Sequence, residues 1–277
     1  MRDYGVDGQL GLEKTPECYV AKMVEIFSEV NRVLKDDGTL WLNLGDTYSA
    51  HKDCKSVGQT LAKGTNSENA HVIDKGKSCS RNSKVLKSIG LKNKDLVGIP
   101  WMVAFALRAD GWYLRQDIIW SKPNPMPESV TDRCTKSHEY IFLMAKSQKY
   151  FYDNEEVQEP IKAVGRPRQF GATNPSGTLR NDVGNMFVDN SKRNKRSVWT
   201  VTTKPFKQAH FAVYPPDLID PCILAGCPEG GIIIDPFSGS GTTALRSKQL
   251  GRKYIGIEIN PDYCKIAEDR LRQEELF

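Results

Sequence analysis

Gly231-Ile-Ile-Ile-Asp-Pro-Phe-Ser-Gly-Ser-Gly-Thr-Thr243 is the stretch around which the predicted fold is organised. Its three isoleucines predict a short buried strand, which Asp235 and Pro236 end. Gly239 and Gly241 then allow a tight turn, and the threonines that follow begin a helix. A strand, a glycine turn and a helix in this order are typical of a nucleotide-type site. Such ligands bind beyond the carboxyl ends of parallel strands, and a helix N-terminus favours a negative group.

A second strand supports this interpretation. Lys253 to Ile259 is apolar and β-branched, and it contains Glu258 near its end. An acidic residue about 20 positions after a glycine turn is placed to bind ribose hydroxyls. Asn260-Pro261-Asp262 then predicts the start of a helix that runs to Leu271. Together these elements predict one ligand-binding βαβ unit rather than a merely buried one.

The composition predicts a globular protein with free thiols. The chain has 277 residues, of which 39% are hydrophobic and 26% charged, enough for one large α/β domain or two small ones. No run approaches the length of a membrane helix, and the N-terminus has no apolar signal region, so we expect a cytoplasmic protein. Seven scattered cysteines suit a reducing compartment.

No metal site is predicted. A zinc site could be imagined from four residues of one polar segment, but their spacing matches no common zinc pattern. These residues are His51, Cys54, His71 and Cys79.

Charge is distributed unevenly along the chain. The formal net charge is +5, but residues 51–94 carry ten Lys or Arg and three Asp or Glu, and residues 160–210 carry ten and two. Two basic segments on a slightly acidic body favour a polyanionic partner. The alternative is that both are simply solvated loops.

Apolar periodicity, caps and turn residues predict the other elements. Thr15-Pro16-Glu17 starts an amphipathic helix, and Pro100 lies in the first turn of another. The predicted helices are 16–34, 96–107 and 217–225, and the predicted strands are 38–44, 113–121, 138–145 and 197–200, with 149–153 as an extension or partner. Residues 50–94 are predicted to be a long loop. Alternation of strands and helices favours a largely parallel sheet.

Several motifs resemble one family. Asp235 to Thr243 resembles the cofactor motif of amino-group DNA methyltransferases, which use S-adenosylmethionine, and Tyr254 to Asn260 resembles their next motif. His210 to Pro215 resembles the segment that completes the methionine end of their cofactor pocket. The resemblance also covers Asp117–Asn124, Arg133, Thr135–Tyr140 and Leu40–Tyr48. It extends over almost the whole chain apart from the two basic loops.

The motif order resembles that of the beta class, in which the cofactor motif comes last. This class methylates adenine N6 or cytosine N4. The resemblance implies a Rossmann-like, circularly permuted α/β fold with a mixed, mostly parallel sheet. It also implies three regions: a catalytic half at 1–145 that contains the basic loop 50–94, a target-recognition region at 146–205, and a cofactor-binding half at 206–277. The DNA sequence that is recognised, and the choice between the two bases, are not predicted.

The resemblance also implies the site residues. The residues expected to bind S-adenosylmethionine are His210, Phe211, Pro215, Asp235, Phe237, Ser238, Gly239, Gly241, Thr242, Glu258 and Asn260. The residues expected to contact DNA are Ser121, Lys122, Asn124, Arg133, Lys192, Arg193, Lys195 and Arg196. Asn43 and Asp46 follow a strand near the active edge and are weak candidates for catalysis.

The catalytic loop of the family, Ser/Asp/Asn-Pro-Pro-Tyr, has no match here. The one Pro-Pro pair, in Tyr214-Pro-Pro-Asp217, lies in the cofactor-completing segment, and Pro123 to Pro127 lacks the aromatic residue. In relatives the loop directly precedes a stretch like Arg2 to Gly5. We therefore expect the chain to begin just after its catalytic motif, and its sheet to lack the N-terminal central strand between the opening strand and Leu40–Leu44. A late start codon, a split or decayed gene and a genuine short form would each explain this.

The sequence thus predicts a site-specific methyltransferase that acts on an exocyclic amine of double-stranded DNA. The target base must leave the stack to reach the methyl group. A restriction endonuclease counterpart and the absence of a membrane partner belong to this prediction. The second hypothesis is a catalytically inactive, truncated relative that binds DNA or cofactor. A nicotinamide-dependent dehydrogenase is the third, and the Asp235-Pro-Phe237 context argues against it.

Overall fold

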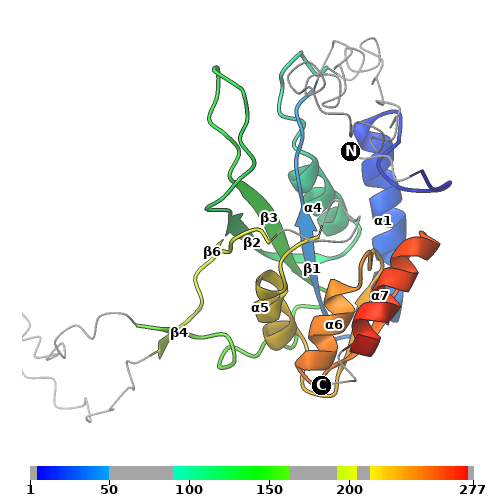
Figure 1. Ribbon diagram of the computed structural model, residues 1–277, viewed down its shortest axis with the longest axis vertical. Helices are drawn as coiled ribbons and strands as arrows, with labels where there is room; N and C mark the ends of the chain where they lie inside the picture. Colours follow the sequence, from blue (N-terminus) through cyan, green and yellow to red (C-terminus); the bar gives the residue numbers. More distant parts are fainter. Residues whose placement is uncertain (1–4, 50–89, 162–191, 205–212, 274–277) are drawn as a thin grey trace, which may run out of the picture.

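The computed structural model of the protein describes residues 5–49, 90–161, 192–204 and 213–273 (Figure 1). The elements in chain order are α1 (Pro16–Val33), β1 (Thr39–Leu44), α4 (Ile99–Ala109), β2 (Tyr113–Ser121), β3 (His138–Ala145), β4 (Glu159–Pro160), β5 (Lys192–Arg193), β6 (Val198–Thr200), α5 (Pro216–Gly226), β7 (Ile232–Asp235), α6 (Thr242–Gln249), β8 (Lys253–Gly256) and α7 (Pro261–Gln273). Much of both basic segments, and all four candidate zinc ligands, lie outside the described residues.

Local sequence accounts for α1. The Thr15 side chain accepts a hydrogen bond from the Cys18 N–H at 3.2 Å, and Pro16 occupies the first turn, as predicted. One face of the helix is buried through Pro16, Tyr19, Met23, Phe27 and Val30. The helix over 16–34 is therefore confirmed to within one residue.

The main sheet has the strand order β1-β3-β2-β6. β3 runs antiparallel to both β1 and β2, and β6 runs parallel to β2. A mixed sheet is confirmed, but the prediction that it is mostly parallel is wrong for the described strands. The physical reason is the connection between β2 and β3, which is a loop over residues 122–137 and contains no crossover helix, so the chain returns antiparallel.

A second, two-stranded sheet carries the opening motif. β7 pairs in parallel with β8, with Ile234 opposite Ile255 and Asp235 opposite Gly256. In the part of the chain that the structure describes, β7 pairs with no strand but β8, and β1 pairs with no strand but β3. The two sheets approach each other through α5, because the Thr39 hydroxyl in β1 donates to the Gly226 carbonyl at 3.3 Å. The sheet of the molecule is thus divided between β1 and β7.

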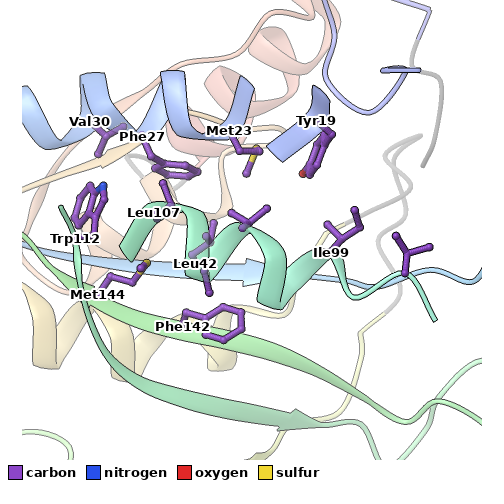
Figure 2. Close-up of a cluster of buried hydrophobic side chains, with 13 residues drawn as sticks. Tyr19, Met23, Phe27, Val30, Leu42, Ile99, Leu107, Trp112, Phe142 and Met144 are labelled. Carbon is purple, nitrogen blue, oxygen red and sulfur yellow. The ribbon is translucent and has the colours of Figure 1, made fainter. Parts of the chain in front are cut away.

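The larger core lies between the main sheet and the helices α1 and α4. Figure 2 shows side chains from α1 and α4 pointing toward one another, with those of β1 and β3 beneath them. Phe142 and Leu107 are fully buried there, and Trp112 is 2% exposed. The buried members are Tyr19, Met23, Phe27, Val30, Leu42, Val97, Ile99, Val103, Ala104, Leu107, Trp112, Phe142 and Met144.

α5 covers the opposite face of the sheet. Its Leu218 and Cys222 pack with Ile118, Trp120, Ile141 and Trp199. The catalytic half is therefore a three-layer α/β structure, and α6 and α7 continue from α5 at the end that carries the C-terminus (Figure 1). Every helix in the described part of the chain is too short or too polar to span a bilayer.

Two predicted elements begin or end elsewhere. α4 begins at Ile99 rather than at 96, because Leu96 forms a bridge with Tyr48 and Gly98 adopts a left-handed conformation with φ of 81°. Residues 149–153 form no strand. Instead, the Phe151 N–H donates to the Asp37 carbonyl at 2.8 Å, which ties this segment to the end of α1.

Candidate active site

Asp235 stands at the end of β7 and organises the glycine turn. One carboxylate oxygen accepts from the Phe237 N–H at 3.0 Å. The other accepts from the Thr243 hydroxyl and from the Tyr214 hydroxyl, the latter at 3.3 Å. Burial of the Tyr214 hydroxyl, and next the charge of Asp235, raise the pKa of Tyr214 far above its ordinary value. Tyr214 therefore stays protonated and can donate throughout the working pH range.

The turn itself has two residues in the left-handed region. Gly239 has φ of 52° and Gly241 has φ of 74°, and Gly241 is the residue that caps α6. The Gly241 N–H donates to the Ser238 carbonyl at 2.9 Å. This geometry presents the first N–H groups of α6 beyond the carboxyl end of β7, which is where an anionic or polar ligand group binds.

Glu258 closes the turn from β8. Its carboxylate accepts from the Gly239 N–H at 2.7 Å and from the Asn260 N–H at 2.8 Å. An ionised carboxylate has about four acceptor positions, so these two bonds leave capacity for two hydroxyl groups. The structure therefore fits the ribose-binding role expected of Glu258. Asn260 serves as a cap, since its side-chain oxygen accepts from the Asp262 N–H at 2.9 Å.

The remaining cofactor candidates are distributed differently. Phe237 is 46% exposed, and its ring lies 6.2 Å from that of Phe27 in α1, centroid to centroid. Pro215 precedes α5 as its N-cap. Ser238 and Thr242 lie within the turn and at the start of α6. His210 and Phe211 lie outside the described residues.

The two weak catalytic candidates have partners within the fold. Asn43 donates through its side-chain nitrogen to the Tyr140 carbonyl at 3.0 Å. Asp46 accepts from the N–H groups of Gly98 at 3.0 Å and Ile99 at 3.1 Å. Gly98 caps α4 without a side chain of its own, so Asp46 supplies the missing cap from another loop. A structural role thus accounts for Asp46.

We predict that Asp46→Ala lowers stability without weakening cofactor binding. Loss of a capping side chain costs about 1 kcal/mol, which is a few degrees in Tm for a chain of this size. Thermal unfolding followed by circular dichroism measures the first effect, and titration of the folded protein with S-adenosylmethionine measures the second. The control is Asp36→Ala, at a side chain that is 99% exposed. An unchanged Tm for the Asp46 variant would contradict the capping role.

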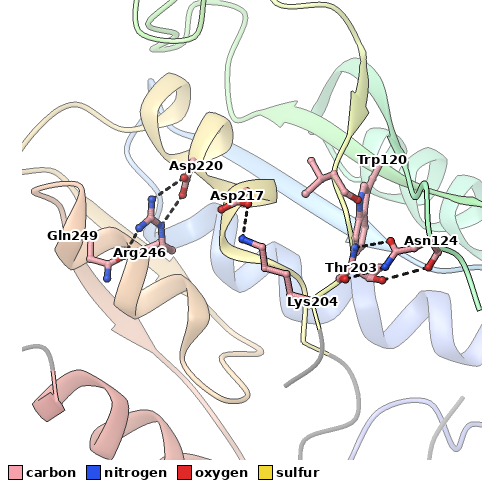
Figure 3. A network of polar contacts seen from close by, with 9 residues as sticks. Trp120, Asn124, Thr203, Lys204, Asp217, Asp220, Arg246 and Gln249 are labelled. Carbon is pink, nitrogen blue, oxygen red and sulfur yellow. Dashed lines mark hydrogen bonds and ion pairs between the residues drawn. The ribbon is translucent and has the colours of Figure 1, made fainter. Parts of the chain in front are cut away.

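The loop after β2 is tied to the segment that follows β6. Asn124 donates to the Thr203 carbonyl at 3.1 Å and accepts from the Thr203 N–H at 3.0 Å (Figure 3). Trp120 donates to the Val201 carbonyl at 2.8 Å. Asn124, predicted to contact DNA, therefore has both side-chain atoms engaged within the protein. Ser121 forms the last pair of the β2–β6 ladder, opposite Thr200.

Two further DNA candidates have acidic partners. Lys122 forms an ion pair with Glu139, and its nitrogen lies 4.1 Å from the centre of the Trp120 ring. Arg133 forms an ion pair with Glu128 at 2.6 Å and lies 3.9 Å from the centre of the Tyr48 ring. Both pairs lie near the ends of the main-sheet strands. The structure brings Lys122 and Asn124 to one loop and places Arg133 beside the loop after β1.

The four basic residues after position 191 surround one acid. Glu159 forms ion pairs with Arg193 at 3.4 Å and with Arg196 at 3.0 Å. Lys195 lies 5.1 Å from the centre of the Trp199 ring, and Lys192 is exposed. The predicted target-recognition region thus supplies β6 to the main sheet and a small β4–β5 ladder. Its residues 162–191 lie outside the described part of the chain.

The sequence interpretation missed three residues that the structure places at the turn. Tyr214 and Thr243 share Asp235, and Arg270 reaches the turn from α7. Tyr214 and Thr243 lie inside the quoted motifs, so their position was a usable signal, whereas nothing local distinguishes Arg270 from the other basic residues of α7. The described residues contain no group of three or more His, Cys, Asp or Glu side chains that could hold a metal ion.

Comparison with protein families identifies this site. The model of a DNA methylase family that transfers methyl groups to N6 or N4 amino groups matches residues 2–269. The chain belongs to this N6/N4 DNA methylase family. It is accordingly an S-adenosylmethionine-dependent DNA methyltransferase that acts on an exocyclic amine of a base.

Relatives of high similarity agree with the family. The chain is 45% identical over 273 residues to the type II methyltransferase M.XycI of Xanthomonas campestris pv. cyanopsidis, covering 98% of this chain and 77% of the relative. It is 45% identical over 281 residues to M.Cfr9I of Citrobacter freundii, covering 99% and 78%. It is 44% identical over 271 residues to M.SmaI of Serratia marcescens, covering 98% and 80%.

Solved structures share the fold. The cytosine-N4-specific PvuII DNA methyltransferase superimposes with a TM-score of 0.60 at 16% identity, over 92% of this chain and 71% of that one. A putative DNA modification methylase from Thermus thermophilus, complexed with S-adenosyl-L-methionine, superimposes with a TM-score of 0.53 at 18% identity, over 93% and 78%. The Rossmann-like methyltransferase fold expected for this N6/N4 DNA methylase is therefore confirmed.

Proposed function

We propose that this methyltransferase modifies a base flipped out of double-stranded DNA at a specific site, as part of a restriction–modification system. The observation that supports a working cofactor site is the turn held between Asp235 and Glu258, with acceptor capacity left on Glu258. The relatives named type II methyltransferases support the restriction–modification context, in which an endonuclease of the same specificity would be the counterpart.

The chain's own residues would bind and orient the reactants. S-adenosylmethionine supplies an electrophilic methyl group when bound. Glu258 would hold the ribose hydroxyls, and the turn at Gly239 to Gly241 would lie against the cofactor. Asn43 lies at the carboxyl end of β1, and its side-chain oxygen is an acceptor that a base amine could use. The exocyclic amine attacks the methyl carbon directly, so no cysteine nucleophile is required.

We also propose that catalysis requires a Ser/Asp/Asn-Pro-Pro-Tyr loop on a strand between β1 and β7. Each of these strands has an edge without a partner among the described residues, and Ile232 in β7 is 60% exposed. A strand inserted there would join the two sheets and satisfy both edges. Pro215 and Pro216 do not provide the loop, because they form the start of α5.

The test is transfer of a labelled methyl group from S-adenosylmethionine to duplex DNA. It compares the 277-residue chain with a version extended at its N-terminus by the residues encoded upstream of the Met1 codon. We expect transfer by the extended version alone, and its Pro-Pro to Ala-Ala variant serves as the control. Nucleoside analysis of the product identifies adenine N6 or cytosine N4 as the acceptor. Transfer by the 277-residue chain would contradict the need for the loop.

The second candidate function is a catalytically inactive relative that binds DNA or cofactor. The specific observation in its favour is the divided sheet, which leaves the edge of β1 open beside the cofactor half. Binding of S-adenosylmethionine by calorimetry, together with no transfer by either version, would favour this function over the enzyme.

A further inference from the structure

Arg270, on α7, is bonded to the glycine turn from the side opposite Glu258 in sequence. Its terminal nitrogen Nη1 donates to the Ser240 carbonyl at 2.6 Å, to the Ser240 hydroxyl at 3.0 Å and to the Thr242 hydroxyl at 3.1 Å. Ser240 and Thr242 are each 3% exposed, so these bonds lie inside the protein. One side chain of α7 therefore contacts the turn and the first residue of α6 together.

The backbone of α7 approaches the same turn. A Cβ built on Gly241 would lie 2.7 Å from the Ala267 Cβ and 3.2 Å from its Cα, closer than atoms of this kind can pack. Ala267 and Arg270 are three residues apart and so lie on one face of α7. The turn is thus held by a steric contact at Gly241 and by a polar contact at Ser240.

The polar contact has an energetic requirement. The Arg270 side chain is half-buried, and desolvation lowers its pKa, although an arginine remains charged at every working pH. A half-buried cation is stable only when its donors are satisfied, and hydrogen bonds from a charged donor are the stronger kind. The Ser240 carbonyl therefore has a strong reason to point toward α7.

We propose that Arg270 is a positioning residue for S-adenosylmethionine. By fixing the carbonyl of Ser240, it fixes the peptide plane between Ser240 and Gly241, because that peptide is planar. The orientation of this plane sets the direction of the Gly241 N–H and the entry into α6. Arg270 contacts no residue expected to touch the ribose, so it acts on cofactor binding through the turn. The inference rests on the proposed cofactor site and adds a residue to it.

The test compares two variants of Arg270 with a matched control on the same helix. Arg270→Met keeps the length of the side chain and removes its donors, and Arg270→Lys keeps one charged donor. Arg272→Met is the control, because Arg272 is 69% exposed and pairs only with acids of its own helix among the contacts described. The dissociation constant of S-adenosylmethionine is measured by calorimetry at a temperature at which circular dichroism shows every variant folded.

We expect the dissociation constant to rise at least about tenfold in Arg270→Met, about 1.4 kcal/mol. We expect a smaller rise in Arg270→Lys and a change within about twofold in Arg272→Met. Hydrogen exchange at the amides of residues 238–242 should increase in the same order. A lower Tm for Arg270→Met with an unchanged dissociation constant and unchanged exchange would overturn the proposal and leave only a structural tie.

Failure of the cofactor site itself would look different. If the unmodified chain does not bind S-adenosylmethionine, the calorimetric arm reports on the proposed site and not on Arg270. The exchange arm still decides the inference, because it measures the turn without ligand. Exchange in Arg270→Met equal to that of the unmodified chain would then overturn it.

Discussion

Replacing Gly241 by alanine is expected to abolish measurable binding of S-adenosylmethionine. Gly241 has φ of 74°, where an alanine costs about 1–2 kcal/mol. The added Cβ would also meet the Ala267 Cβ at 2.7 Å, and overpacking of this kind costs about 1–3 kcal/mol. Either α7 moves away or the turn unwinds. In both cases the turn between Asp235 and Glu258 loses the shape that fits the cofactor.

Gly251→Ala is the matched control for this prediction. Gly251 also has φ of 74°, but the nearest atom to a built Cβ is a Glu229 side-chain carbon at 3.5 Å, an ordinary contact. Both variants lose the backbone freedom of glycine, and only the Gly241 variant meets α7. We expect Gly251→Ala to lower Tm and keep the dissociation constant measured by calorimetry. Equal cofactor affinities in the two variants would contradict the role of α7 contact.

The second large effect is expected from Asp235→Ala. It removes the acceptor of three donors, the Phe237 N–H and the hydroxyls of Tyr214 and Thr243. A buried donor left without an acceptor costs about 1–3 kcal/mol. The turn would be released at both its first residue and its helix end. We expect the dissociation constant of S-adenosylmethionine to rise at least about a hundredfold, measured by calorimetry on the folded protein.

Two further variants define how Asp235 acts. Tyr214→Phe removes one donor and leaves the carboxylate, so a smaller loss of affinity is expected, about tenfold or less. Asp217→Ala is the control, because Asp217 is 59% exposed and pairs with Lys204 at the surface (Figure 3). Binding by Asp235→Ala that matches this control would show that the carboxylate is dispensable for the turn.

Local sequence was sufficient for most elements of the fold. β2 and β3 were predicted with their observed bounds, and the strand of the opening motif was predicted as the start of a glycine turn and helix. Apolar periodicity, caps and glycines act over a few residues, so their effect is legible in a single sequence. The family motifs likewise identified the cofactor half, because its ligand groups lie on consecutive loops.

Partners distant in sequence could not be predicted in the same way. Asp46 was a candidate for catalysis and instead caps α4, 52 residues further along the chain. Asn124 was a candidate for DNA contact and instead bonds Thr203, 79 residues away. Polar side chains at the ends of strands suit both kinds of role. Only the packing of separate loops shows which donors stand within reach of each carboxylate or amide.

The sequence by itself determined the family, the cofactor and the ligand turn of this methyltransferase, because the residues from Asp235 to Thr243 and Glu258 carry that chemistry within one βαβ unit. Tertiary structure alone decided that β3 runs antiparallel, that the sheet is divided between β1 and β7, and that Arg270 supports the turn. Strand direction depends on how a connection crosses the sheet, and a side-chain clamp depends on where a helix packs. Both are properties of the assembled layers rather than of any one segment.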